Sequence, residues 1–350
     1  MKSAGRFLML SSLMLMLTSL AAGQRYSVTD LGSLDPGGVV DVSFANGINR
    51  FGHVAGSSYT ALHLHAYLWT KPQGMQDLGT LGGSTSIAYA INDSGTVVGQ
   101  ADLANGDVHA FSWTRARGMQ DLGTLGGHES AAFGINDAGV IVGESYPANG
   151  VAPHAFLWSM GHGMQDLGTL GGDTSEAHAI NNLGEVVGFS AITGNGDTHG
   201  FVWGESEGMR DLSTIKSYYP SYAYGINDIG RVVGYAGIAQ VYSYTYGFLW
   251  TESKGLKLLG FLEGGTQSFG LGINLSGQVV GSFNNALGIS YAFVWTESAG
   301  MQDLNTLIPA NSGWILGPAT AINIGGQIVG SGPVLIKGTY TNHAFLLTPQ

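Results

Sequence analysis

Glu144, Glu176 and Glu263 are carboxylates whose positions in the sequence could support acid–base chemistry. Glu144 follows a short apolar segment, at a position where other copies of the same motif carry serine, glutamine or an aromatic residue. Glu176 and Glu263 fall in segments that we expect to be loops, as do His128 and Glu129. Two carboxyl groups held about 5–9 Å apart can hydrolyse a glycosidic bond. The three glutamates are therefore candidate catalytic groups, although the sequence favours reading them as solvated loop charges.

Asp102, Asp107 and Asp197 lie in short oxygen-rich segments of the kind that can bind calcium. Neither segment completes the Asp-x-Asp-x-Asp-Gly pattern with a later glutamate, and both contain Asn-Gly, a common hairpin turn signal. Plain turns are favoured, with a calcium site as the alternative. His63 and His65 lie on the same face of an expected strand, but no third metal ligand is evident near this pair, so we expect no metal there.

Tyrosines are concentrated in one part of the chain, since eight of the fifteen fall between positions 218 and 246. Five of them lie in expected loops: Tyr218, Tyr219, Tyr222, Tyr242 and Tyr244. A tyrosine presents a flat apolar ring and a hydroxyl group at low entropic cost, which suits sugar stacking or protein contact. We therefore expect a binding patch here. The other three, Tyr224, Tyr235 and Tyr246, are interpreted as residues that pack within strands.

Three motifs recur seven times and must position these residues. The first is Asp-Leu-Gly, with Asp30, Asp77, Asp121, Asp166, Asp211 and Asp303, and with Leu258 in the sixth copy. The second is Ile-Asn-x-x-Gly before an apolar pair and glycine, with Asn49, Asn92, Asn136, Asn181, Asn227, Asn274 and Asn323. The third is His-Ala-Phe-x-Trp, beginning at His65, His109, His154, His199 and His343, with Tyr246 and Tyr291 in the remaining copies. One such polar group per repeat indicates a structural hydrogen bond rather than a catalytic ring.

Each repeat predicts four short antiparallel strands, for example residues 75–78, 88–91, 96–99 and 109–113. Four strands in about 45 residues is the content of a propeller blade, so we predict an all-β, seven-bladed β-propeller, with a β-solenoid as the alternative. Residues 24–350 form this single domain. The chain begins and ends within the repeat pattern, and its ring could close either by strand exchange between the termini or by continuous repeats.

Links of constant length and links of variable length lie at opposite ends of the expected strands. The asparagine lies seven residues before the glycine that closes the third strand, and the fourth-strand His or Tyr lies twelve residues before the next Asp or Leu. The links from the first to the second strand and from the third to the fourth vary in length. In a meander these variable links share one end, which we name the variable face. Binding residues concentrate on loops that do not set packing, so we expect function on the variable face.

The segments His-Ala-Phe-Leu-Trp at 154–158, Met-Gln-Asp-Leu-Gly-Thr-Leu-Gly-Gly at 164–172 and Ile-Asn-Asn-Leu-Gly-Glu-Val-Val-Gly at 180–188 resemble the HAF family of extracellular repeats. The resemblance covers essentially the whole chain after residue 23. It implies an exported bacterial protein and brings no established activity. We expect no translocation barrel or sorting tail after residues 343–347.

The first 23 residues have the pattern of a secretory signal peptide: basic Lys2 and Arg6, an apolar run from 7 to 20, and small residues at 21–23. No later segment is apolar enough to span a membrane, so a secreted or periplasmic product is expected. Without Lys2 and Arg6 the chain keeps 11 basic and 24 acidic side chains, which argues against binding to nucleic acid. Cysteine is absent, so stability must come from the core.

These observations favour a secreted binding or interaction module whose partner is a carbohydrate or a surface protein. Two alternatives stay open: a secreted carbohydrate-active hydrolase that uses the loop carboxylates, and a structural surface repeat protein. The sequence identifies neither the ligand nor the oligomeric state.

Overall fold

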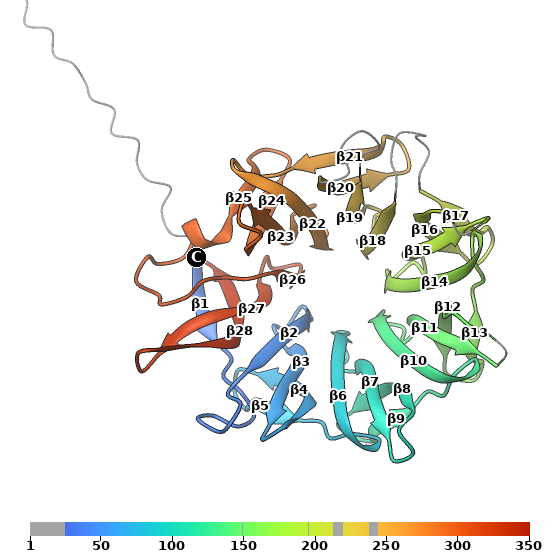
Figure 1. Ribbon diagram of the computed structural model, residues 1–350, viewed down its shortest axis with the longest axis horizontal. Helices are drawn as coiled ribbons and strands as arrows, with labels where there is room; N and C mark the ends of the chain where they lie inside the picture. The colour runs from blue at the N-terminus through green and yellow to red at the C-terminus, as the bar shows by residue number, and fades with distance from the viewer. Residues whose placement is uncertain (1–24, 149, 195, 213–219, 238–243) are drawn as a thin grey trace, which may run out of the picture.

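The computed structural model describes residues 25–148, 150–194, 196–212, 220–237 and 244–350. The expected signal peptide, residues 1–23, therefore lies outside the described residues. Within these ranges the chain forms β-strands and one short 3-10 helix, η1 (Leu304–Thr306), and no helix there is long and apolar enough to cross a membrane. Figure 1 shows the strands arranged around a central opening, which is the arrangement of a β-propeller.

The repeating unit is a four-stranded antiparallel meander, illustrated by β2 (Ser43–Ile48), β3 (Val54–Thr60), β4 (His63–Thr70) and β5 (Gly74–Asp77), which pair in chain order. In Figure 1, β2 lies beside the opening and β5 at the outside. A second four-stranded sheet contains β14 (Gly171–Ile180), β15 (Val186–Ile192), β16 (Thr198–Gly204) and β17 (Gly208–Asp211). The Asp-Leu-Gly strand of each sequence repeat is thus the outer strand of the preceding sheet.

Two larger sheets each consist of two such meanders. One contains β6 (Gly82–Ile91), β7 (Val97–Leu103), β8 (Val108–Thr114), β9 (Gly118–Asp121), β10 (Gly126–Ile135), β11 (Ile141–Pro147), β12 (His154–Ser159) and β13 (Gly163–Asp166). The other contains β18 (Ser221–Ile226), β19 (Val232–Gly237), β20 (Thr245–Thr251), β21 (Gly255–Gly260), β22 (Gly265–Ile273), β23 (Val279–Asn285), β24 (Ser290–Thr296) and β25 (Gly300–Asp303). A single parallel residue pair joins the two meanders in each case, Val108 with Glu129 and Thr245 with Gln267.

The N-terminal strand completes the C-terminal sheet. This sheet has the order β1-β28-β27-β26 and contains β1 (Tyr26–Asp30), β26 (Ala319–Ile322), β27 (Ile328–Ile336) and β28 (Thr339–Pro349). Tyr26 pairs with Pro349 and Asp30 with Phe345. His343 Nδ1 lies 2.9 Å from Asp30 Oδ1, which adds a side-chain contact to the ladder. Of the two closures that the sequence allows, the structure therefore has strand exchange between the termini.

A cycle of asparagine side chains joins the hairpin turns around the opening. Asn92 Nδ2 donates to the Asn136 carbonyl at 3.0 Å, while its Oδ1 accepts from the Thr96 amide within its own turn. The same donation to the next carbonyl is made by Asn49, Asn136, Asn181, Asn227, Asn274 and Asn323, and the last of these returns to Asn49. The motif asparagine thus shapes its own turn and also ties it to the next, a link that the sequence pattern does not reveal.

The core lies between adjacent sheets. Phe111 of β8 is fully buried and packs in one cluster with Ala55 and Leu68 of the preceding sheet. The glycine that closes each third strand permits close approach of the inner strand: a Cβ at Gly99 would lie 1.9 Å from the Ile87 carbonyl oxygen. This steric limit explains why glycine recurs at that position.

The repeated His–Asp pairs stabilise the outer strands, as their one-per-repeat spacing indicates. His65 Nδ1 lies 3.0 Å from Asp77 Oδ2, and Asp77 also accepts a 2.8 Å hydrogen bond from the Gly79 amide. The other pairs are His109–Asp121, His154–Asp166, His199–Asp211 and His343–Asp30. Where the histidine is replaced by Tyr246, the tyrosine instead stacks on Phe261 at 5.0 Å.

Candidate functional site

Side chains of one repeated position line the inner strands beside the opening. Successive residues of a strand point to opposite faces. In β10, Ala132 is buried while the next residue, Phe133, is only half-buried. The corresponding half-buried residues of β6, β14 and β18 are Tyr89, His178 and Tyr224. Alternation thus brings one aromatic ring from each of these inner strands to the same level of the opening.

These rings form a continuous row. Tyr89 contacts Phe133 edge-on, with ring centroids 5.2 Å apart, and Phe133 stacks on His178 at 4.9 Å with an interplanar angle of 4°. His178 lies 4.5 Å from Tyr224. Centroid separations of 4.5–7 Å are typical of favourable aromatic pairs.

A second level of rings lies against this row. Tyr222 contacts Phe189 at 4.8 Å and stacks on Tyr235 at 4.9 Å, and Tyr235 contacts Phe269 at 5.0 Å. Phe189 is 5.2 Å from His178, which joins the two levels. We call the eight residues the aromatic cluster: Tyr89, Phe133, His178, Phe189, Tyr222, Tyr224, Tyr235 and Phe269. All eight are half-buried, so each retains surface that a ligand can reach.

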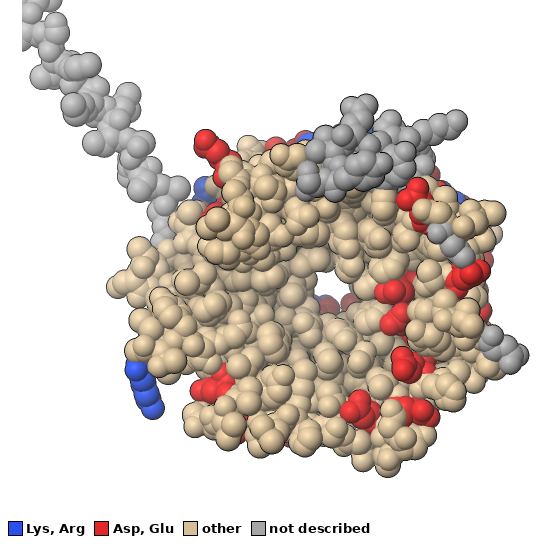
Figure 2. All heavy atoms as spheres, in the orientation of Figure 1, with Lys and Arg blue, Asp and Glu red and all other residues tan. Residues whose placement is uncertain are grey.

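Two of the three glutamates singled out in the sequence lie beside this cluster. Glu144 is on β11, paired with Ala131, and Glu176 is on β14, paired with Phe189. Glu176 Oε2 lies 3.3 Å from His178 Nε2. Figure 2 shows acidic side chains gathered on the side of the opening formed by β10, β11 and β14. The structure therefore brings two candidate carboxylates and Tyr222 into one region, which we call the channel mouth.

Electrostatics at the channel mouth favour a protonated Glu144. Burial raises the pKa of this carboxyl to about 7, and the nearby charges of Glu176 and Glu129 add to the effect. Among the described residues Glu144 has neither a hydrogen-bond donor nor an ion-pair partner. Burial also raises the pKa of Tyr224, which is hydrogen-bonded to Tyr235, so both hydroxyls stay neutral near pH 7. The channel mouth therefore combines aromatic surface with one carboxyl group, Glu144, that has no partner among the described residues.

Four of the residues expected in loops belong to strands instead. His128 and Glu129 lie within β10. Glu176 lies within β14 and Tyr222 within β18, because the inner strands begin before the apolar segment that marks them in the sequence.

Tyr224 and Tyr235, interpreted from the sequence as packing residues, belong to the aromatic cluster. Tyr224 follows buried Ala223 on the inner strand β18, and Tyr235 precedes buried Ala236 on the second strand β19. This alternation places both rings on the side away from the buried alanines, and it is the signal that could have found them. Sequence reasoning also missed His178, whose ring joins the two levels.

The other predicted tyrosines do not join the cluster within the described residues. The ring centroid of Tyr244 lies 5.8 Å from that of Phe261 and 6.4 Å from that of Tyr246. These residues lie near β20 and β21, outside β18 and β19 in the order of the sheet. The three remaining members of the predicted patch, Tyr218, Tyr219 and Tyr242, lie outside the described residues. Glu263 is exposed in a turn, and no described contact joins it to Glu144 or Glu176.

Of the candidate calcium ligands, Asp107 and Asp197 lie in hairpin turns and Asp102 lies near the end of β7. Asp107 Oδ2 accepts a 2.7 Å hydrogen bond from Asn105, and Asp102 Oδ2 accepts one from Ser84 at 3.4 Å. The Asp197 carbonyl closes its turn by accepting from the Ile192 amide. Across the described ranges, no group of three or more His, Asp or Glu side chains is placed to hold a metal ion. The structure thus gives the local oxygen atoms hydrogen-bonding roles in these turns.

No family model and no curated protein matches the chain. Among solved structures it is similar to a gluconolactonase from Xanthomonas campestris, at 7% identity and a TM-score of 0.45 over 95% of this chain and 94% of that one. It is similar to TolB from Acinetobacter baumannii at 12% identity and a TM-score of 0.42 over 61% of this chain, which spans about half, 54%, of the TolB structure. A triple arginine-to-alanine mutant of AofleA from Arthrobotrys oligospora matches at 12% identity and a TM-score of 0.42, over 80% of this chain and 90% of that one. These similarities are too low to assign a function to the chain.

Proposed function

We propose that the protein is an exported binding module, a seven-bladed β-propeller of the HAF repeat type, that binds a carbohydrate at the channel mouth. The seven copies of each sequence motif and the closed cycle of seven asparagine side chains support the blade number. The basic and apolar pattern of residues 1–23 supports export to the periplasm or the medium. The partner is a sugar chain, free or on a surface protein.

The observation that carries this proposal is the environment of Glu144. A half-buried carboxyl without a hydrogen-bonding partner costs free energy in the free protein, and sugar hydroxyl groups can supply that partner. Tyr89 of the aromatic cluster is close enough to Glu144 for the carboxylate charge to raise the pKa of its hydroxyl, and sugar faces stack on such rings. Ligand sites typically combine apolar and aromatic walls with a few convergent polar groups, and the channel mouth has this composition.

Binding to an array of neutral, acidic and amino-sugar glycans, followed by titration of each positive glycan, tests the proposal. Tyr222→Ala removes a ring that contacts both Phe189 and Tyr235, and we expect it to weaken binding at least tenfold. The matched control is Tyr340→Ala, because Tyr340 is an exposed tyrosine on β28 that belongs to no described ring contact. Equal loss of binding in both variants, or retention in both, would refute a site at the channel mouth. Failure of the wild type to bind any glycan would leave the structural surface-protein alternative as the better account.

A second candidate function, glycoside hydrolysis, is favoured by one specific feature of the same residues. A carboxyl with a pKa of about 7 is protonated often enough at neutral pH to act as a general acid. Glu176 lies close enough to raise that pKa, so the two groups have the environments that an acid and a nucleophile or base require.

Product analysis separates binding from turnover. Each glycan bound by the wild type is incubated with protein at stoichiometric and catalytic ratios, and released sugars are measured. Sugar release that disappears in Glu144→Gln while binding persists would establish hydrolysis. Binding without release would establish the binding module. Glu263→Gln, which removes an exposed carboxyl away from the channel mouth, is the control and should behave as wild type in both measurements.

A further inference from the structure

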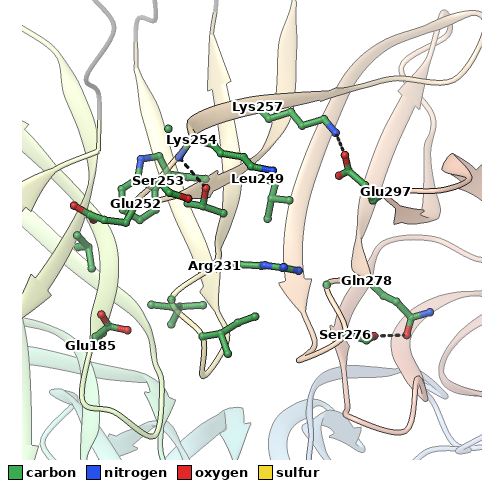
Figure 3. Close-up of a pocket in the computed structure, with 18 of the residues that line it drawn as sticks. Glu185, Arg231, Leu249, Glu252, Ser253, Lys254, Lys257, Ser276, Gln278 and Glu297 are labelled. Carbon is green, nitrogen blue, oxygen red and sulfur yellow. Dashed lines mark hydrogen bonds and ion pairs between the residues drawn. The ribbon is translucent and has the colours of Figure 1, made fainter.

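A second concave site lies on the face opposite the channel mouth, where the hairpin turns of three neighbouring meanders meet. The cavity has a volume of about 1170 Å³, and its walls include the turn residues Leu183, Ile229 and Ser276 and the hairpin at 251–255. Figure 3 shows the side chains that line it. The sequence assigns this face to packing, because its links have constant length. The cavity is larger than the roughly 300–1,000 Å³ typical of small-ligand sites, so an oligomeric ligand fits its size.

Most charged side chains at the rim of the cavity are already paired. Arg210 contacts Glu207 at 2.8 Å and Glu252 at 3.3 Å. Lys257 Nζ lies 2.7 Å from Glu297 Oε1 and 5.1 Å from the centre of the Trp295 ring. These pairs neutralise one another, so the charge available to a ligand must come from other residues.

Arg231 and Lys254 have no such partner among the described residues, and of the two Arg231 extends into the middle of the cavity. Among the described residues, no carboxylate lies within ion-pair distance of its guanidinium group. Figure 3 shows this side chain extending across the middle of the cavity, with no interaction drawn to it. A methyl group at Gly277 would lie 2.5 Å from Arg231 Nη1, so the guanidinium rests against the turn of the next meander. The backbone amide of Arg231 is held by Asn227 Oδ1 at 3.0 Å, which fixes where the side chain begins.

Glu297, whose pKa the charge of Arg231 helps to lower, is already paired with Lys257. The hydrogen bond from Lys257 holds the pKa of Glu297 below its ordinary value, and the charges of Lys254 and Arg231 contribute in the same direction. One carboxylate thus faces three cations. The carboxylate on the other wall, Glu185, already accepts a 2.6 Å hydrogen bond from Asn181, a member of the asparagine cycle. Four basic and four acidic side chains line this cavity, so its formal charge is balanced, whereas the chain as a whole is acidic.

We propose that this cavity binds an acidic oligosaccharide, with the guanidinium of Arg231 pairing with a uronate carboxylate. Arginine binds a carboxylate through two parallel hydrogen bonds, which fixes orientation as well as affinity. Ser253, Ser276 and Gln278 on the walls supply hydroxyl and amide groups for the sugar hydroxyls. This site is separate from the channel mouth and does not depend on the function proposed for it.

Calorimetric titration with a trimer of galacturonic acid tests the proposal, with a trimer of galactose as the neutral probe. We expect the full-length mature protein to bind the acidic trimer at least tenfold more tightly, and binding to weaken as sodium chloride is raised from about 20 to 200 mM, since screening acts on exposed charges. Arg231→Gln should lower the affinity at least tenfold. Arg50→Gln is the matched control, because Arg50 lies at another hairpin turn and pairs with Asp93.

Four outcomes would overturn the proposal: no binding of the acidic trimer, equal binding of the neutral trimer, undiminished affinity in Arg231→Gln, or tighter binding of a pentaglutamate peptide than of the acidic trimer. Lys254→Gln provides a second test in case Arg231→Gln does not fold. It removes a neighbouring cation and leaves the contact between Arg231 and the turn at Gly277 unchanged. It should weaken binding several-fold. Circular dichroism and the thermal midpoint of each variant must match the wild type for its result to count.

Discussion

Replacing Glu144 by glutamine should make the protein more stable at alkaline pH and leave its stability at acidic pH nearly unchanged. Glutamine keeps the size and hydrogen-bonding groups of a protonated carboxyl but cannot ionise. In the native protein, burial and the charges of Glu176 and Glu129 raise the pKa of Glu144 to about 7, from 4.5. The folded state therefore resists the ionised form, and the substitution removes that cost.

The sign and size follow from proton linkage. Between pH 4.5 and about 7 the folded chain keeps the Glu144 proton while the unfolded chain loses it, so stability falls as pH rises through this window. Each pKa unit corresponds to about 1.4 kcal/mol, which sets an upper limit of roughly 3 kcal/mol. Partial exposure of the carboxyl reduces this to about 1–3 kcal/mol. The advantage of Glu144→Gln should be near zero at pH 4 and should reach its full value by pH 8.

Urea unfolding followed by tryptophan fluorescence at pH values from 4 to 8.5 measures this effect as a difference between two curves. Other groups also titrate in this range, among them His343. Burial disfavours its charged form, but the hydrogen bonds and charges of Asp30 and Asp41 outweigh burial and raise its pKa. Because His343 is present in both proteins, the difference between wild type and Glu144→Gln isolates Glu144. Glu263→Gln, which removes an exposed carboxyl, is the control for the loss of a glutamate as such.

A difference curve that is flat between pH 4 and 8, or one in which the variant loses stability as pH rises, would refute the reasoning. The first result would show that Glu144 is solvated like a surface carboxyl. The second would show that its ionised form accepts stabilising hydrogen bonds in the native state.

Two further predictions concern the closure of the ring and the asparagine cycle. Deleting residues 24–31 removes β1 and the buried side chain of Tyr26. We expect the free energy of unfolding to fall by roughly 5 kcal/mol and the thermal midpoint to fall by about 10 °C or more. An unchanged midpoint in a calorimetric scan would argue against strand exchange. Asn92→Ala removes the hydrogen bond that links its turn to the Asn136 carbonyl, which keeps only the Gly139 amide as donor, and it leaves the Thr96 amide without its acceptor. We expect this to cost about 2–3 kcal/mol in urea unfolding, whereas Asn105→Ala, in an exposed turn, should stay within about 0.5 kcal/mol of wild type. Similar values for both would contradict a structural role for the cycle.

Residue types alone predict part of the candidate site. Tyr222, Glu144 and Glu176 stand out because they depart from the repeat, and the structure places all three at the channel mouth. Tyr224 and Tyr235 occupy ordinary strand positions, so their types suggest packing alone. Their membership in the aromatic cluster depends on where β18 and β19 lie relative to the neighbouring sheets. That position follows from how neighbouring sheets pack, and it is absent from the alternation within any one repeat.

Local order in this protein follows from the repeated motifs alone: short strands, asparagine–glycine turns, and the spacing that pairs His65 with Asp77 in adjacent strands. These features depend on contacts between residues close along the chain, so the repeated motif specifies them. The tertiary structure decided what depends on distant segments. It pairs β1 with β28, closes the asparagine cycle from Asn323 to Asn49, and leaves Arg231 unpaired over a turn of the next meander. Such contacts arise only when the sheets close around a common opening, because each partner comes from a different repeat.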